Sequence, residues 1–137
     1  MKVLVATDGS EHSMKAVQRA LEMAEKEGAK VTLMAVAYFS GEGLDEMPPN
    51  IQEKLENEAA AALRKGKALF DAKGIAVETV LEAGLVPANN ILRKAEEEGF
   101  EKIVMGSTGL TGLKRVLLGS TAAKVVAHAP CSVTIVR

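Results

Sequence analysis

The sequence predicts an α/β protein built on one open parallel sheet of five strands with helices on both faces. Apolar, strand-like runs alternate with amphipathic, helix-like segments along the 137 residues, in the order β-α-β-α-β-α-β-α-β. Several of the runs are apolar without polar alternation, which is typical of strands that are covered on both faces. Strands that alternate with covering helices imply parallel pairing and right-handed crossovers. The chain length fits a single domain.

The five predicted strands are short runs rich in β-branched and apolar residues. They span residues 3–7, 31–38, 76–81, 102–105 and 132–136. The four predicted helices combine apolar spacings of three and four residues with recognisable start and stop signals. Ser10 and Pro87 start the first and third helices, residues 51 and 120 start the second and fourth, and the stops are Gly28, Gly74, Gly99 and Pro130.

Composition excludes several classes of function. The net charge is −1 and no cluster of Lys or Arg stands out, which disfavours a nucleic-acid partner. Three Phe, one Tyr and no Trp are too few to stack a single strand of bases. No apolar run reaches the roughly 20 residues that cross a bilayer, so we expect no membrane insertion. The lone cysteine, Cys131, fits a reducing compartment and predicts a cytoplasmic protein.

A glycine-rich segment follows the fourth predicted strand. Its glycines include Gly106, Gly109 and Gly119, and the next helix opens with Ser120 and Thr121. Glycines at the end of a strand let the backbone approach a ligand and expose N–H groups to it. A helix N-terminus adds further N–H groups and the positive end of a dipole. The segment therefore predicts a site for a phosphate chain.

The spacing of this segment differs from the two common phosphate motifs. No Gly-Lys-Ser/Thr follows, and Gly106, Gly109 and Gly112 are spaced G-x2-G-x2-G, unlike a dinucleotide fingerprint. Hydroxyls at Ser107, Thr108, Thr111 and Ser120 can reach phosphate oxygens, and Lys114 and Arg115 can balance their charge. Capping of the helix by Ser120, and solvent exposure of the two cations, are alternatives that the sequence leaves open.

A second polar loop, Thr7-Asp8-Gly9-Ser10, follows the first predicted strand. The Asp8 carboxylate can accept bonds from ribose hydroxyls, an adenine amino group or a metal-bound water, or it can close a local Asp-Gly turn. If the sheet grows outward in both directions from the first strand, this loop and the glycine segment meet at one edge. Met105 then lines either a base pocket or the core.

The two histidines and the cysteine are not predicted to be catalytic. We expect His12 to be exposed on the first helix and His128 to lie in the last turn of the fourth. Cys131 is expected to be packed, because no base lies at a spacing that would activate its thiol.

Three segments carry a resemblance to a known family. Residues 3–17, 102–126 and 128–137 read VLVATDGSEHSMKAV, KIVMGSTGLTGLKRVLLGSTAAKVV and HAPCSVTIVR. They resemble the universal stress protein family over nearly the whole chain, and the spacing G-x2-G-x9-G-S marks that family's ATP-binding branch. The resemblance implies a Rossmann-like sheet in the order 3-2-1-4-5, a bound ATP with a divalent metal such as Mg²⁺ or Mn²⁺, and a homodimer.

The resemblance also implies roles for individual residues. Asp8 is expected near the nucleoside or the metal, and the Val36 main chain is expected to bond to adenine. Gly106, Thr108 and Gly109 are expected to surround the ribose and phosphates, with the phosphate tail on Gly119, Ser120 and Thr121. Thr7 and Met105 complete the predicted site.

These features predict an ATP-binding regulatory module rather than an efficient enzyme. A phosphate cradle is present, but no base or pair of acids stands ready for phosphoryl transfer. Two alternatives remain open. One is a slow ATP hydrolase or self-phosphorylating protein, and the other is a dimeric interaction protein without nucleotide. A flavin or NAD protein is disfavoured by the missing fingerprint.

The fifth predicted strand gives a physical argument for a homodimer. As the last strand it would form an apolar edge of the sheet, with Val133 and Val136 near its ends and no charge before Arg137. Exposed apolar edges favour pairing with another strand. We therefore expect two copies to pair antiparallel through residues 133–136. A protein partner is also expected, but the sequence does not identify it.

Overall fold

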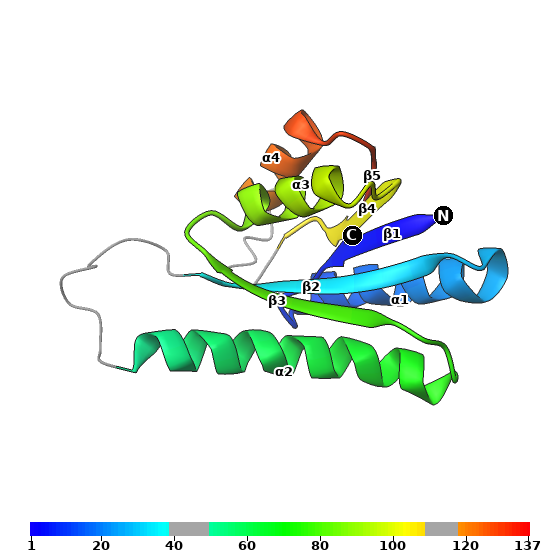
Figure 1. Ribbon diagram of the computed structural model, residues 1–137, viewed down its shortest axis with the longest axis horizontal. Coiled ribbons are helices and arrows are strands. Elements are labelled where there is room, and N and C mark those ends of the chain that lie inside the picture. The colour runs from blue at the N-terminus through cyan, green and yellow to red at the C-terminus, as the bar shows by residue number, and fades with distance from the viewer. Residues whose placement is uncertain (39–49, 109–117) are drawn as a thin grey trace.

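The computed structural model describes residues 1–38, 50–108 and 118–137, which form a parallel five-stranded sheet with four helices (Figure 1). The strand order β3-β2-β1-β4-β5 confirms the predicted fold. The strands are β1 (Lys2–Ala6), β2 (Lys30–Tyr38), β3 (Glu78–Gly84), β4 (Lys102–Gly106) and β5 (Ser132–Val136). The helices are α1 (Glu11–Glu27), α2 (Ile51–Ala72), α3 (Pro87–Glu97) and α4 (Ser120–His128).

The sheet separates two apolar cores. Helices α1 and α2 pack on one face, and α3 and α4 pack on the other (Figure 1). The central strand β1 serves both cores, because Val3 and Val5 belong to the first and Leu4 to the second, each with 0% exposure. Burying one such side chain contributes roughly 1.5–3 kcal/mol. Double coverage explains why β1 is apolar at successive positions.

Three local signals have the effects that the sequence predicts. Ser10 caps α1 by accepting a hydrogen bond from the Ser13 N–H at 3.3 Å. Gly28 ends α1 with a φ of 68°, a left-handed conformation that suits glycine. Pro87 is the first residue of α3, where its missing N–H costs nothing because that group has no partner within a helix.

The third strand begins and ends later than the predicted residues 76–81. Ile75 and Val77 precede β3, and their partly buried side chains pack against the core beneath α1 and α2. Pairing with β2 instead continues to the Tyr38–Gly84 pair. Because β3 is an edge strand with alternating exposure, its apolar content is lower than that of the connection before it. The apolar run therefore placed the strand too early, although residues 78–81 belong to both the predicted and the observed strand.

Two predicted features lie outside the described residues. They are the irregular segment predicted between residues 39 and 50, of which 39–49 are not described, and the part of the glycine segment at 109–117, which includes Gly109. Within the described ranges, no helix combines the length and apolar character needed to cross a membrane.

Candidate functional site

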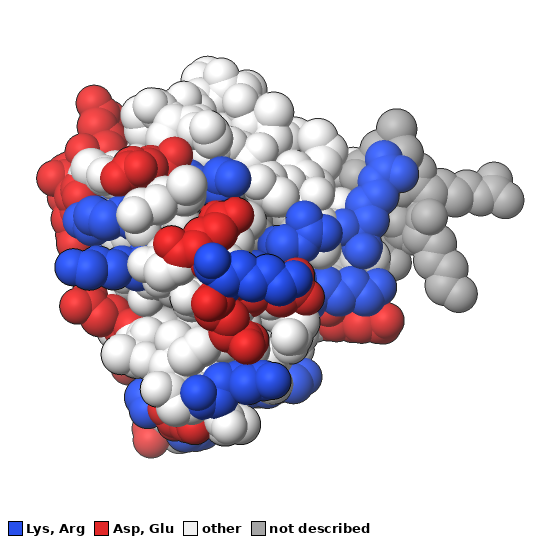
Figure 2. Space-filling view, turned by 90° about the vertical axis from the view of Figure 1, so that its right-hand side faces the viewer, with Lys and Arg blue, Asp and Glu red and all other residues white. Residues whose placement is uncertain are grey.

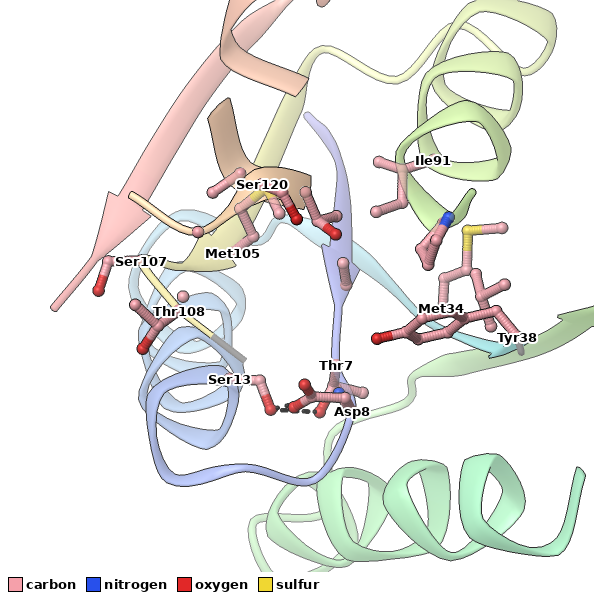
Figure 3. A pocket seen from close by; sticks show the side chains of 17 residues that line it. Thr7, Asp8, Ser13, Met34, Tyr38, Ile91, Met105, Ser107, Thr108 and Ser120 are labelled. Carbon is pink, nitrogen blue, oxygen red and sulfur yellow. Dashed lines mark hydrogen bonds between the residues drawn. The ribbon is translucent and has the colours of Figure 1, made fainter. Parts of the chain in front are cut away.

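A pocket opens at the carboxyl ends of β1, β2 and β4 (Figure 3). β1 pairs with β2 on one side and with β4 on the other, so the direction in which the sheet grows reverses here. Open parallel sheets bind ligands at such a reversal point. The pocket is lined by Ala6, Thr7, Asp8, Ser13, Met34, Val36, Tyr38, Pro87, Ile91, Met105, Gly106, Ser107, Thr108, Gly119, Ser120, Thr121 and Ala122.

The structure brings most of the predicted site residues together in this pocket. Those that line it are Thr7, Asp8, Val36, Met105, Gly106, Thr108, Gly119, Ser120 and Thr121. The remaining one, Gly109, lies outside the described residues. The loops after β1 and β4 therefore meet as the parallel topology requires, and their role in binding stays a prediction.

Hydrogen-bonded hydroxyls form the β1 side of the pocket. Ser13 donates its only hydroxyl hydrogen to the Ser10 carbonyl, with 3.1 Å between the oxygens. Thr7 must therefore be the donor in its 3.0 Å contact with Ser13 Oγ. These hydroxyl oxygens also accept main-chain hydrogens, Thr7 from Gly9 and Ser13 from Asp8, both at 3.3 Å. Both hydroxyl hydrogens are thus used within the protein, and Thr7 and Ser13 position the turn.

Asp8 closes the predicted Asp-Gly turn and also lines the pocket. Its Oδ1 accepts a hydrogen bond from the Ser10 N–H at 2.9 Å, and Gly9 follows with a φ of 81°. Lys65 of α2 donates from Nζ to the Gly9 carbonyl at 3.1 Å and so fixes the turn from the other side. The two readings of Asp8 that the sequence left open are compatible, because a carboxylate has two oxygens and several lone pairs.

The N-terminus of α4 forms the opposite side of the pocket. Gly119 is the N-cap residue, and no side chain caps the helix. The Gly119 N–H donates to the Ser107 carbonyl at 2.6 Å, and the first helical hydrogen bond runs from Ala123 to Gly119 at 2.9 Å. The N–H groups of residues 120–122 have no partner among the described residues. A helix start of this kind binds anions through its N–H groups and its dipole.

Gly106 is needed for packing. A Cβ at this position would lie 2.7 Å from the backbone carbonyl carbon of His12, closer than such atoms can come. The missing side chain therefore lets the first turn of α1 approach β4. For the same reason His12 is half-buried and not exposed as predicted, and its Nδ1 has no hydrogen-bond partner among the described residues.

Apolar side chains form a third wall, most of which the sequence reasoning missed. The lining residues that were not predicted are Ala6, Ser13, Met34, Tyr38, Pro87, Ile91 and Ala122. Met34 and Tyr38 are two residues on either side of Val36, so the strand period of two could have identified them. Pro87 and Ile91 come from α3, and no local pattern in that helix indicates a pocket.

A polar cluster supports this wall from the β3 side. Asn90 donates to Glu82 at 2.9 Å, and Arg93 forms an ion pair with the same carboxylate. Burial opposes ionisation of Glu82, but the hydrogen bonds from Arg93 and Asn90, together with the Arg93 and Lys94 charges, hold its pKa below the ordinary value. The cluster thus ties α3 to β3 beside the pocket.

The pocket lining that the structure describes has one charged side chain, Asp8, and oxygen donors from Ser, Thr and Tyr. Over the described residues, no three His, Cys, Asp or Glu side chains gather as a metal site. Cys131 is half-buried, and burial raises the pKa of its thiol, which keeps it protonated as expected of a packed cysteine. His128 is exposed in the last turn of α4.

Fold and pocket together define the class of protein. It is a doubly wound α/β protein whose pocket lies where the strand order reverses, with an uncapped helix start on one side and an apolar wall on the other.

The chain belongs to the universal stress protein family, whose family model matches residues 1–137. Universal stress protein MJ0531 of Methanocaldococcus jannaschii is 38% identical over 142 residues, which cover 99% of this chain and 81% of the relative.

Solved structures show the same fold. Universal stress protein UspA from Lactobacillus plantarum has a TM-score of 0.87 at 29% identity, covering 100% of this chain and 97% of that one. A universal stress protein in complex with cAMP has a TM-score of 0.74 at 28% identity, covering 100% and 96%.

Proposed function

We propose that this pocket binds an adenine nucleotide, ATP in the first instance, and that the chain acts as a nucleotide-dependent regulatory module. The observation that carries the proposal is the meeting of an uncapped helix N-terminus, a carboxylate-bearing turn and an apolar wall in one pocket. The related protein in complex with cAMP supports it, because cAMP is an adenine nucleotide that also joins a flat base to an anionic phosphate.

The proposed orientation follows from the chemistry of the three walls. The phosphate tail lies on Gly119, Ser120 and Thr121, where uncovered N–H groups and the α4 dipole favour negative charge. The base lies against the apolar wall, with the Val36 main chain as its hydrogen-bonding edge and Met105 at its side. Gly106 and Thr108 lie beside the ribose and the first phosphates, and the role expected of Gly109 falls outside the described residues.

A divalent metal, Mg²⁺ or Mn²⁺, fits the donor set. The described lining offers oxygen donors, among them the Asp8 carboxylate and the Ser and Thr hydroxyls. Hard cations prefer such donors and are commonly held by one or two carboxylates together with the phosphates of a nucleotide. Asp8 would hold the ion, whose charge would offset that of the phosphates. Binding of ATP should therefore weaken when EDTA removes the metal.

The proposed role is regulatory because the described lining holds no group suited to activate a nucleophile. Asp8 accepts the Ser10 N–H and is proposed to hold the metal, and Thr7 and Ser13 donate their hydrogens within the protein. A nucleotide that binds one conformation better than another shifts the population toward it. A protein partner would then recognise the favoured conformation.

Calorimetry with Mg-ATP tests the proposal, together with mass spectrometry of small molecules released from the purified protein. We expect saturable binding of ATP, weaker binding of adenosine, and a copurified adenine nucleotide. No heat at millimolar Mg-ATP and no copurified nucleotide would reject the proposal in favour of an interaction protein without nucleotide. Release of phosphate well above background, abolished by Asp8→Ala, would instead favour a slow hydrolase.

We also propose a homodimer through β5. This strand is an edge of the sheet, and among the described residues only β4 pairs with it. The Val136 carbonyl accepts the Ser107 N–H and so faces β4. Successive residues of a strand direct their main-chain groups to opposite sides, so the N–H groups of Val133 and Ile135 face away from β4.

Sedimentation velocity tests the dimer. Val133→Pro removes an outward N–H at an edge position that tolerates proline, so we expect a folded monomer. Val133→Ala keeps that N–H and should remain dimeric. A monomeric parent protein at micromolar concentration would refute the interface.

A further inference from the structure

Tyr38 is the last residue of β2 and the one aromatic side chain in the pocket lining that the structure describes. The period of the strand places it on the same face as Met34 and Val36, which pack beneath α3 and α4. Figure 3 shows its ring reaching from the end of β2 toward the middle of the pocket, with the hydroxyl foremost. The ring thus extends the apolar wall to the pocket mouth.

This ring is exposed in a chain that otherwise buries its described aromatic side chains. Phe70 and Phe100 are 0% and 5% exposed in the two cores, whereas Tyr38 is 40% exposed. Its partner in β3 is Gly84, so no cross-strand side chain holds the ring against the sheet. Asn90 fills the space above that glycine and is fixed by its hydrogen bond to Glu82. Tyr38 therefore offers exposed surface at the pocket to a ligand.

We propose that Tyr38 determines specificity for the base by stacking its ring on the nucleobase of the bound nucleotide, an inference that rests on the function proposed above. Stacking buries apolar surface of the ring and adds a favourable interaction between π-systems. A single exposed ring can stack on a single base, as in a mononucleotide, whereas a strand of nucleic acid would need several such rings. The aliphatic residues of the wall cannot supply this interaction.

Two properties of the ligand follow. A purine offers a larger flat surface than a pyrimidine, so ATP binds more tightly than CTP. Ribose 5-phosphate has no base and cannot stack at all. The phenol hydroxyl is not needed for stacking, because stacking uses the face of the ring and not its polar tip.

The composition of the chain makes the stacking directly measurable. Because the protein has one Tyr and no Trp, its tyrosine emission comes from Tyr38 alone. Titration with Mg-ATP should quench this emission saturably, with half-saturation at the dissociation constant found by calorimetry. Ribose 5-phosphate should leave it unchanged. N-acetyltyrosinamide at the same ATP concentrations corrects for light absorbed by adenine.

Variants separate the ring from its hydroxyl. Tyr38→Phe keeps the ring, so calorimetry should give an affinity for ATP within about twofold of the parent protein. Tyr38→Leu loses the stacking and should bind about tenfold more weakly. Leu85→Ala is the matched control, because Leu85 is an apolar side chain with 72% exposure outside the pocket lining. It should leave the affinity unchanged.

The possible failures are distinguishable. Calorimetric binding of ATP without a change in tyrosine emission would overturn the stacking and leave the proposed function standing. An unchanged affinity in a folded Tyr38→Leu variant would do the same. Absence of binding heat in protein that carries no copurified nucleotide would overturn the proposed function and the stacking together.

Discussion

Helices α1 and α4 both begin at the pocket. Their N-cap residues have almost the same backbone angles, but only α1 is capped by a side chain. The N-cap residue of α1 is Ser10, with φ −68° and ψ 163°, and its hydroxyl accepts the Ser13 N–H. The N-cap residue of α4 is Gly119, with φ −67° and ψ 166°, and no side chain caps that helix. The difference is a single hydroxymethyl group.

The comparison separates residues that position the site from residues that face a ligand. At α1 the polar groups of Thr7, Asp8 and Ser13 are engaged with one another and with the backbone. At α4 the N–H groups of residues 120–122 have no hydrogen-bond partner among the described residues. The chain therefore fixes one side of the pocket by itself, and in the proposed function the other side is left to the phosphates of the nucleotide. Away from the pocket, Figure 2 shows an exposed face on which acidic and basic side chains are interspersed, without a large region of one sign.

The largest expected effect comes from adding a methyl group at Gly106, one of the two glycines in the described pocket lining. Gly106→Ala places a Cβ 2.7 Å from the His12 backbone, so α1 or β4 must move. We expect the free energy of unfolding to fall by about 1–3 kcal/mol, as in other overpacked sites. Chemical denaturation monitored by circular dichroism measures it.

Gly119→Ala is the matched control for this experiment. Its Cβ would meet the Ser107 carbonyl oxygen at 3.4 Å, an ordinary contact, and the backbone conformation suits alanine. Alanine is a poorer N-cap residue than glycine, so stability should fall by about 0.5 kcal/mol, less than for Gly106→Ala. A Gly106→Ala variant as stable as Gly119→Ala would show that α1 does not require this glycine.

A second pair of variants compares hydroxyls on the two sides of the pocket. Thr7→Val keeps the shape of a 5% exposed side chain but removes a donor to Ser13 and an acceptor for the Gly9 N–H. Loss of these bonds should cost roughly 1–2 kcal/mol of stability. Ser120→Ala changes an exposed residue and should cost less than about 0.5 kcal/mol while weakening ATP binding.

Thermal denaturation and calorimetry on the same two proteins decide this comparison. The expected pattern is a stability defect for Thr7→Val and an affinity defect for Ser120→Ala. The reverse pattern would contradict the division between positioning and ligand-facing residues.

The fold could be predicted from the sequence because its signals are local. Ser10, Gly28 and Pro87 mark helix ends through backbone chemistry that acts at the residue itself. The bounds of β3 could not be found in this way, since pairing with β2, and not apolar content, determines where that strand lies. The cytoplasmic location predicted from composition stays a prediction.

The residues of the candidate site that lie on the two loops could be predicted, whereas those that α3 contributes could not. Loops at the carboxyl edge carry glycines and hydroxyls in recognisable order, and parallel topology brings them together. Ile91 enters the pocket from α3, which only tertiary packing determines. The reason for Gly106 was equally hidden, because a sequence shows a missing side chain without showing what occupies its place.

The smallest effect is expected from a substitution that gives α4 the same N-cap residue as α1. Gly119→Ser recreates the Ser10 arrangement on nearly identical backbone angles. The new hydroxyl should accept an α4 N–H and stabilise the fold by a few tenths of a kcal/mol. Because it competes with a phosphate, the affinity for ATP should fall by roughly two- to fivefold. Gly119→Ala, which adds no hydroxyl, is the control, and equal affinities of the two variants would argue against phosphate on these groups.

Amide NMR during nucleotide titration tests the central claim most directly. If the phosphates of ATP lie on the α4 N-terminus, the N–H resonances of Ser120, Thr121 and Ala122 shift saturably with Mg-ATP and far less with adenosine. The Ser13 N–H, already held by Ser10, shifts little with either. Saturated binding of ATP that leaves the three α4 resonances in place would contradict the account.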